Sequence, residues 1–286
     1  MALEPARPAP CGQSDVVPTP EQRESPAPMD PVGLFIPCYV DQLYPAVGLA
    51  TARVLERLGV PVEFPEGQTC CGQPMANAGA VSAAAPVARH HLDVFERYAQ
   101  VVCPSGSCTA MVRHHYADIL PGDPRVETVG GRTYELCEFI TDVLGVRRIA
   151  GTFRKRVGLH QSCHGLRELR LGSGSERMIE PWNKVGSLLT TLEGIELVEL
   201  TRPDECCGFG GIFSVDESAV SGAMGRDRVA DHAKAGAEVV TAVDMSCLMH
   251  LEGIARRGRS PLQFLHVAQV LDTAMSAAPE ARGSAA

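Results

Sequence analysis

The stretch VGLFIPC, residues 32–38, is a short apolar run bounded by turn residues, and it ends on a cysteine. A run of this length and composition is typical of a buried β-strand. The stretch KRVGLHQSC, residues 155–163, has the same character and also ends on a cysteine. The chain therefore contains an internal repeat, and the repeat decides which fold we expect.

Further predicted elements follow both opening strands in the same order. In the first unit we expect a helix at 43–59, a strand at 60–64, a helix near 79–99, a strand running into a turn at 99–108 and a closing helix at 133–145. In the second unit we expect a helix near 176–192, a strand at 195–200, a helix near 215–235, a strand at 237–247 and a closing helix at 261–274. Strands that alternate with helices predict βαβ units and mostly parallel sheets. The expected class is α/β, with two pseudo-repeated halves and with cysteines at the carboxyl ends of the strands.

Composition separates the repeat from its flanks. Residues 1–31 hold eight of the 21 prolines and show no periodic apolar pattern, which predicts a disordered leader rich in Pro and Ala. We place a first cysteine-rich domain at 32–150, a second at 151–275 and a flexible tail at 276–286. The repeat therefore accounts for nearly all of the part that we expect to fold.

The chain has 286 residues, a net charge of −8 and 45% hydrophobic residues. The negative charge argues against nucleic acid or an acidic membrane as a partner held by bulk charge. No apolar run reaches the roughly 18–20 residues that cross a bilayer, and the N-terminus lacks the pattern of a secretory signal. We therefore expect a cytoplasmic protein, in which clustered cysteines stay reduced and bind metal or carry out redox chemistry.

Eight of the eleven cysteines form two sets with the same skeleton, Cys…Cys-Cys-Gly…Cys. The first set is Cys38, Cys70, Cys71 and Cys108, and the second set is Cys163, Cys206, Cys207 and Cys247. These cysteines fall at or after predicted strand ends. Because ligands of parallel sheets bind at the carboxyl ends of the strands, the four cysteines of each half are expected to converge on one crevice.

The cysteine chemistry favours a metal centre. Thiolates are soft ligands that suit iron–sulfur clusters, zinc and Cu(I). Structural zinc sites usually use closely spaced cysteine pairs, and this chain contains no Cys-x-x-Cys. Adjacent cysteines favour a polynuclear centre, because neighbouring thiolates can bind different irons, and the following glycine lets the backbone turn close to it.

The alternative is that some cysteines only fill the core, as buried free cysteines often do. This interpretation is favoured for Cys103 and Cys137, which have no counterpart in the other unit. Cys11 lies in the predicted leader and is not expected to be a ligand.

Three histidines lie close to the second set in the sequence. His160 and His164 flank Cys163, and His250 follows Cys247 by three positions. They could ligate or tune a metal centre, or protonate a bound substrate. The other possibility is that they are hydrogen-bonded or solvent-facing side chains without a role in chemistry.

The duplicated skeleton resembles the cysteine-rich CCG domain family, which includes one of the subunits of heterodisulfide reductase and the iron–sulfur subunit of glycolate oxidase. The lactate utilization protein A family within it is similar in four segments: FPEGQTCCGQP (64–74), PSGSCTAMVRHHY (104–116), CCGFGGIFSV (206–215) and SCLMH (246–250). The resemblance covers residues 32–275. The chain has no ferredoxin-type Cys-x2-Cys-x2-Cys-x3-Cys segment, which the glycolate oxidase subunit carries in addition.

The resemblance implies a cytoplasmic iron–sulfur subunit that transfers electrons in a three-component system oxidising L-lactate to pyruvate for growth on lactate. It implies one or two clusters per chain, of the [4Fe–4S] type, bound by the two cysteine sets. It also implies partner subunits with further clusters, and it makes L-lactate a candidate ligand. The catalytic residues stay unknown. The alternatives are a heterodisulfide or thiol–disulfide reductase subunit, and a zinc-stabilised scaffold.

The chain departs from the family pattern at one position in each unit. The pattern of heterodisulfide reductase ends in Cys-x-x-Cys and supplies five cysteines to an unusual cluster. Here the final position is Met111 in the first unit and His250 in the second. A four-thiolate cluster, or a site completed by His250 or by substrate, therefore fits better than a five-cysteine cluster.

Overall fold

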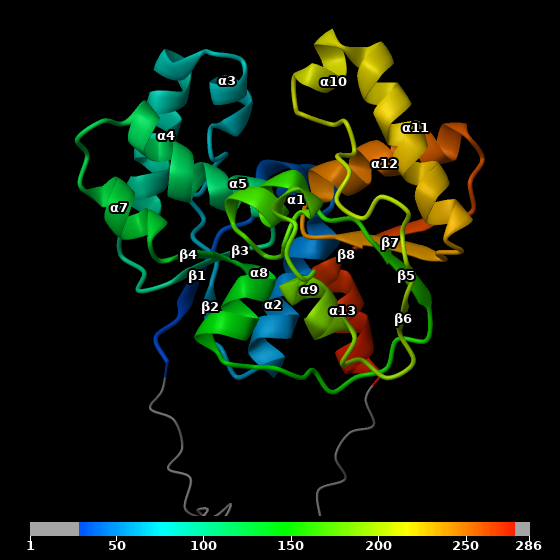
Figure 1. Ribbon diagram of the computed structural model, residues 1–286. Coiled ribbons are helices and arrows are strands. Elements are labelled where there is room, and N and C mark those ends of the chain that lie inside the picture. The colour runs from blue at the N-terminus through cyan, green and yellow to red at the C-terminus, as the bar shows by residue number, and fades with distance from the viewer. Residues whose placement is uncertain (1–28, 278–286) are drawn as a thin grey trace, which may run out of the picture.

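The computed structural model describes residues 29–277 and contains two four-stranded sheets (Figure 1). The strands are β1 (Val32–Leu34), β2 (Val62–Glu63), β3 (Val101–Cys103), β4 (Thr133–Glu135), β5 (Arg156–Leu159), β6 (Glu196–Leu197), β7 (Val239–Ala242) and β8 (Gln263–His266). The sheet orders are β2-β1-β3-β4 and β6-β5-β7-β8, and all neighbouring strands are parallel. The predicted α/β class with two pseudo-repeated halves is confirmed.

Two sequence predictions fall outside the described part of the chain. Cys11 and almost all of the predicted leader lie there, as does most of the predicted tail. The boundary between domains at residues 150 and 151 stays a prediction.

Helices cover both sheets. The first half contains α1 (Cys38–Leu43), α2 (Pro45–Arg57), α3 (Gln73–Asn77), α4 (Val81–Phe95), α5 (Gly106–Ala110), α6 (Tyr116–Ile119), α7 (Arg125–Gly130) and α8 (Leu136–Glu138), with π-helical turns η2 (Met111–His115) and η3 (Phe139–Val143). The second half contains a π-helical turn η4 (His164–Glu168), a 3-10 turn η5 (Ser175–Arg177), and helices α9 (Lys184–Leu189), α10 (Phe213–Asp216), α11 (Ser218–Lys234), α12 (Met245–Arg257) and α13 (Val267–Ser276). No described helix is both long and apolar enough to span a membrane.

The six strands that the sequence predicts are all present, but the fourth strand of each sheet was not predicted. β4 and β8 occupy the beginnings of the segments 133–145 and 261–274, which we expected to be helical throughout. In both cases a buried side chain, Glu135 or His266, ends the strand and accepts backbone hydrogen bonds that begin the next helix. The helix expected near 176–192 is also shorter, because it begins only after the cap Asn183.

The closing helix of each half packs against a helix of the other half. α13 lies against α2, and α8 lies against α9 (Figure 1). Val54 and Leu55 of α2 and Leu271 of α13 are fully buried in one core that both halves share. Ion pairs reinforce the first contact, where Asp272 on α13 binds Arg53 at 2.6 Å and Arg57 at 2.5 Å.

The CCG turns follow the edge strands β2 and β6. Gly72 and Gly208 both have a φ of +86°, a left-handed conformation that glycine adopts without the strain that a Cβ brings. Their surroundings differ. A Cβ on Gly208 would lie 2.8 Å from Ser221 O and from Met224 Cβ, whereas the nearest atom to a Cβ on Gly72 would be Ala84 O at 3.5 Å.

We expect Asp272→Asn to lower the free energy of unfolding by about 1–2 kcal/mol, because it removes charge-assisted hydrogen bonds between the two halves. The matched control is Glu193→Gln, which removes the exposed ion pair with Arg154 and should cost less than about 0.5 kcal/mol. Denaturant unfolding of both variants at neutral pH provides the comparison. Equal losses would show that Asp272 does not join the halves.

We expect Gly72→Ala and Gly208→Ala to destabilise the protein unequally. Both place a Cβ at positive φ, at a cost of about 1–3 kcal/mol. Gly208→Ala should cost about 1–3 kcal/mol more, because its Cβ overlaps a backbone oxygen that cannot move aside easily. Thermal unfolding of the two variants is the measurement, and a Gly72→Ala variant that is the less stable one would contradict this account.

Candidate metal centre

All eight repeated cysteines line a single crevice between the two halves. Its lining comes from the segments that follow β1, β2, β3, β5, β6 and β7, so the crevice lies at the carboxyl ends of the strands of both sheets. The eight are Cys38, Cys70, Cys71, Cys108, Cys163, Cys206, Cys207 and Cys247. None of the ten cysteines in the described residues forms a disulfide. The structure therefore brings together the two sets that the sequence predicts, and their assignment as ligands stays a prediction.

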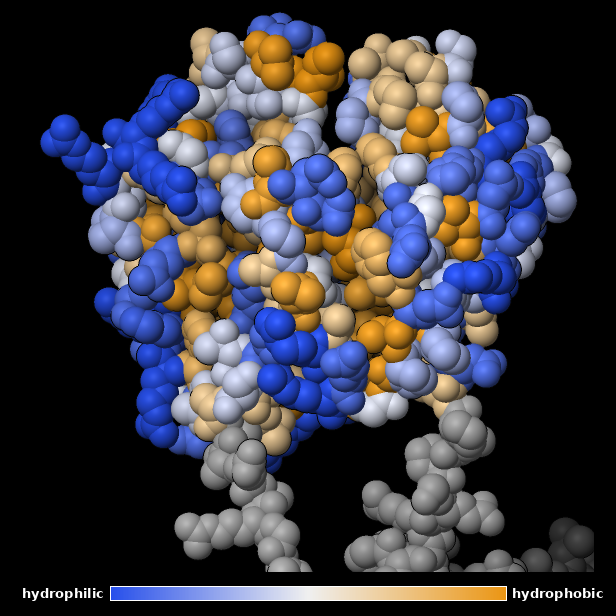
Figure 2. All heavy atoms as spheres, turned by 180° about the vertical axis from the view of Figure 1, so that it is seen from behind, coloured by the Kyte–Doolittle hydropathy of each residue, from blue (hydrophilic) through white to orange (hydrophobic). Residues whose placement is uncertain are grey.

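The crevice is open at one side of the molecule. In Figure 1, α3 and α10 stand on opposite sides of the gap above the sheets, and both described chain ends lie on the opposite side. Seen from behind in Figure 2, a notch separates the two lobes, and apolar residues are visible below it between charged surfaces. The lining of the crevice reaches Pro74 and Asn77 of α3 and Gly210 and Gly211 before α10, so this is the side from which a ligand or partner protein can approach.

The sulfur atoms of each set lie close together. Cys38 Sγ is 3.7 Å from Cys70 Sγ, and the thiols of Cys70 and Cys108 are the neighbours of Cys71. The second set repeats this order, with Cys206 next to Cys163 and with Cys207 between Cys206 and Cys247. Each set is thus a row of four thiols that leads from the end of the opening strand to α5 in the first half and to α12 in the second half.

Backbone amides point at several of these sulfurs. Gly72 N donates to Cys70 Sγ at 3.4 Å, and Gly208 N donates to Cys206 Sγ at the same distance. Phe209 N adds a contact of 3.5 Å to Cys207 Sγ. Such amides stabilise thiolate charge, and hydrogen bonds to sulfur tune iron–sulfur potentials. The contact from the glycine amide is the same in both halves.

One thiol of each set favours the charged form. Hydrogen bonding from Cys38 holds the pKa of Cys70 well below its ordinary value, and hydrogen bonding from Cys163 does the same for the pKa of Cys206. The pKa of Cys71 rises because it donates to its neighbours and is buried. Each set therefore carries a thiolate, the form that binds metal, beside thiols that must still lose a proton.

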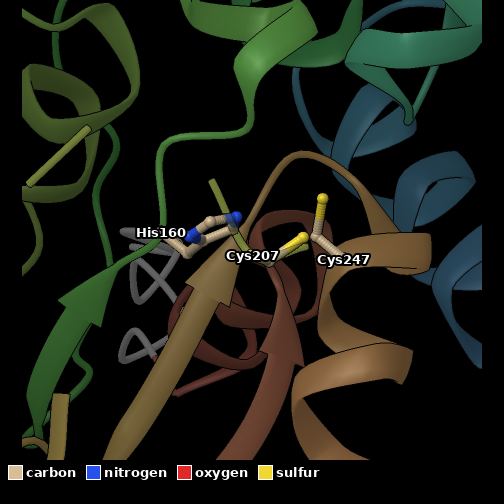
Figure 3. Close-up of side chains that lie close together, drawn as sticks. All are labelled: His160, Cys207 and Cys247. Carbon is tan, nitrogen blue, oxygen red and sulfur yellow. The ribbon is translucent and has the colours of Figure 1, made fainter. Parts of the chain in front are cut away.

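The spacing of the sulfurs differs from that of a single-ion site. Four sulfurs around one zinc at 2.3 Å would all lie within about 4 Å of one another. Among the described Cys, His, Asp and Glu residues, only one group has three ligand atoms that lie within 4.8 Å of one another, and it consists of His160, Cys207 and Cys247 (Figure 3). The first set contains no such group. The two sets therefore differ in how closely their ligand atoms gather.

A buried polar contact joins the halves at the edge of the crevice. Asp244, three residues before Cys247, accepts hydrogen bonds from Ser105 Oγ at 2.8 Å and from Ser107 N at 2.9 Å. Burial would raise the pKa of Asp244, but hydrogen bonds from Ser162, Ser107 and Ser105 hold it below its ordinary value. The sequence motifs single out neither Asp244 nor Ser105. Their equivalent positions before the last cysteine of each set are the signal that could have found them.

Two of the three candidate histidines lie beside sulfurs of the second set, and the third does not line the crevice. His160 is buried against the second set, and burial lowers its pKa to about 4, so its ring is neutral at physiological pH. His164 Nδ1 lies 3.6 Å from Cys163 Sγ. His250, the residue at the missing fifth cysteine position, does not line the crevice, and its Nε2 lies 3.5 Å from Ser221 Oγ.

The remaining candidates lie inside the protein core. Met111, at the other missing cysteine position, is 1% exposed and packs in an apolar cluster of the first half. Cys103 packs in the same cluster, and Cys137 packs in the core that both halves share. Neither Cys103 nor Cys137 lines the crevice. Their places agree with the core role that the sequence favours for them.

The cavity within the crevice has a volume of about 110 Å³. Since a water molecule occupies about 30 Å³ in the liquid, this space suits a small acid or a few waters. It is far smaller than the roughly 300–1,000 Å³ of pockets for larger organic ligands.

Comparisons with known proteins agree with this geometry. The cysteine-rich domain family, CCG, matches residues 32–113 and 157–252. The lactate utilization protein A of Halalkalibacterium halodurans is 38% identical over 245 residues, which are 84% of this chain and 96% of the relative. The proteins of the same name from Bacillus velezensis and Bacillus subtilis are 40% and 39% identical, each over 85% of this chain and 99% of the relative.

Solved structures are less similar. A putative Asp/Glu racemase from Yersinia pestis covers 87% of this chain and is covered over 98% of its own length, with 13% identity and a TM-score of 0.37. A likeness at this level carries no argument about fold or function. The family match and the relatives cover most of the chain. The chain belongs to the cysteine-rich CCG domain family, together with the proteins named lactate utilization protein A.

Proposed function

We propose that this protein is a cytoplasmic iron–sulfur subunit that transfers electrons in a three-component system oxidising L-lactate to pyruvate. The observation that carries the proposal is the row of four thiols in each half, both rows lining one crevice. The names of the relatives supply the link to lactate. In this proposal each row binds one cluster, which [4Fe–4S] chemistry would suit.

The donor set supports iron–sulfur chemistry. Thiolates are the ligands of iron–sulfur clusters, and the backbone amides at Cys70, Cys206 and Cys207 supply hydrogen bonds to sulfur. Burial of Cys71 and Cys108 keeps water away from part of the first set. When bound, such clusters accept and donate single electrons.

The stoichiometry of lactate oxidation also supports two centres. Conversion of L-lactate to pyruvate removes two electrons and two protons, so two one-electron centres on one chain match the electrons of one turnover. Other subunits must then deliver or accept them. Ile212, Val215 and Val220 are exposed apolar side chains on and beside α10 and α11, and Ile212 directly follows Gly211, which lines the crevice. They support docking of a protein partner there.

Two alternative functions, a zinc-stabilised scaffold and a thiol–disulfide reductase subunit, each have one structural observation in their favour. A zinc-stabilised scaffold is favoured by the compact group of His160, Cys207 and Cys247, which approaches single-ion spacing. A thiol–disulfide reductase subunit is favoured by the close approach of Cys38 and Cys70, which carry a raised and a lowered pKa. The first predicts colourless protein with zinc, and the second predicts turnover of a disulfide substrate.

We expect anaerobically purified protein to contain iron and acid-labile sulfide. Cys71→Ser and Cys207→Ser should each remove about half of the iron, because each removes a central thiolate of one row. Cys137→Ala is the control and should keep the iron content, because Cys137 is a core residue that does not line the crevice. Iron, sulfide and zinc analysis, with electron paramagnetic resonance of the reduced protein, provides the measurement.

Two results would contradict the proposal. Zinc without iron in the wild-type protein would remove both redox functions. Full iron content in both the Cys71 and Cys207 variants would show that the rows of thiols are not the ligands.

A further inference from the structure

The two cysteine rows differ at one equivalent position. Phe35 lies three residues before Cys38, and His160 lies three residues before Cys163. Both follow the opening strand of their half, and both donate their backbone amide to the neighbouring strand, Phe35 N to Val102 O at 2.9 Å and His160 N to Thr241 O at 2.8 Å. At equivalent positions, the first half therefore has the phenyl ring of Phe35 and the second half has the imidazole of His160.

His160 lacks a hydrogen-bond partner although it is a polar side chain in the core. The residue is 1% exposed, and neither ring nitrogen has a partner among the described residues. A buried polar group without a partner is costly unless a ligand satisfies it. A ring nitrogen of His160 lies within 4.8 Å of the Cys207 and Cys247 sulfurs, and Figure 3 shows the ring edge directed toward them.

The first row has no imidazole in this place. Phe35 packs in an apolar cluster that includes Cys71 and Cys108. The nearby His91 is also buried, but its ring packs against Phe35 at a centroid distance of 4.6 Å. It belongs to no group of three ligand atoms within 4.8 Å among the described residues. Among the described residues, an imidazole nitrogen thus lies close to two sulfurs of the second row, and no such group exists at the first row.

We propose that His160 is a metal ligand of the second row, so that the second centre has mixed thiolate and imidazole ligation while the first has thiolates alone. The proposal deepens the proposed function and rests on it, because it assigns unequal centres to one electron-transfer chain. In Rieske centres, two histidines take the place of two cysteines on one iron, and the potential differs from that of all-cysteine centres. Imidazole ligation in one row would therefore make the two centres chemically distinct.

The experiment looks for metal-bound nitrogen. The reduced wild-type protein should show a ¹⁴N hyperfine coupling from one centre in pulsed electron paramagnetic resonance, and His160→Phe should abolish it. The matched control is His232→Phe, since His232 is a buried histidine beside His160, with ring centroids 6.4 Å apart, and belongs to no such group of ligand atoms in the described part of the chain. This control should keep the coupling. If His160→Phe does not fold, His160→Asn replaces it.

X-ray absorption at the edge of the bound metal separates this inference from the proposed function. Protein that loads zinc instead of iron would contradict the proposed function, but a nitrogen ligand lost in His160→Phe would still support the ligand assignment. Absence of any metal-bound nitrogen in wild-type protein that contains metal would overturn the assignment of His160 as a ligand. So would a nitrogen ligand that survives in His160→Phe and His160→Asn.

Discussion

The buried hydrogen bond between Ser105 and Asp244 is the contact on which the crevice depends. The two residues occupy equivalent positions, and each begins the helix that carries the last cysteine of its row. The Asp244 carboxylate also accepts from Ser107 N, so it caps the first turn of the other half's helix rather than its own. The two helices therefore start next to each other, and Cys108 and Cys247 are delivered to the same crevice.

Duplication has kept the backbone of the halves and changed their chemistry. Strand order, glycine conformation and the amide contacts to Cys70 and Cys206 are the same in both. The side chains that cap the closing helices are Glu135 in one half and His266 in the other. A buried side chain such as Glu135 or His266 can thus differ between the halves while the backbone that aligns the thiols stays the same.

Local patterns in the sequence were enough to predict three strands of each sheet and the convergence of the four cysteines within each half. Short apolar runs identify strands such as β1 and β5, and parallel sheets fix which ends of strands meet. β4 and β8 were missed because their few residues precede helical patterns without a break. Asp244 and Ser105 were missed because they are 139 positions apart, and no local rule indicates that they touch.

The exchange of closing helices has a consequence for the order in which the chain can fold. Synthesis proceeds from the N-terminus at about 5–20 residues per second, so about 10–40 s separate α2 from α13. During this time the apolar face of α2, with Val54 and Leu55, has no cover from its final partner. The core of the first half therefore stays incomplete until α13, the last helix, has been synthesised and packs against α2.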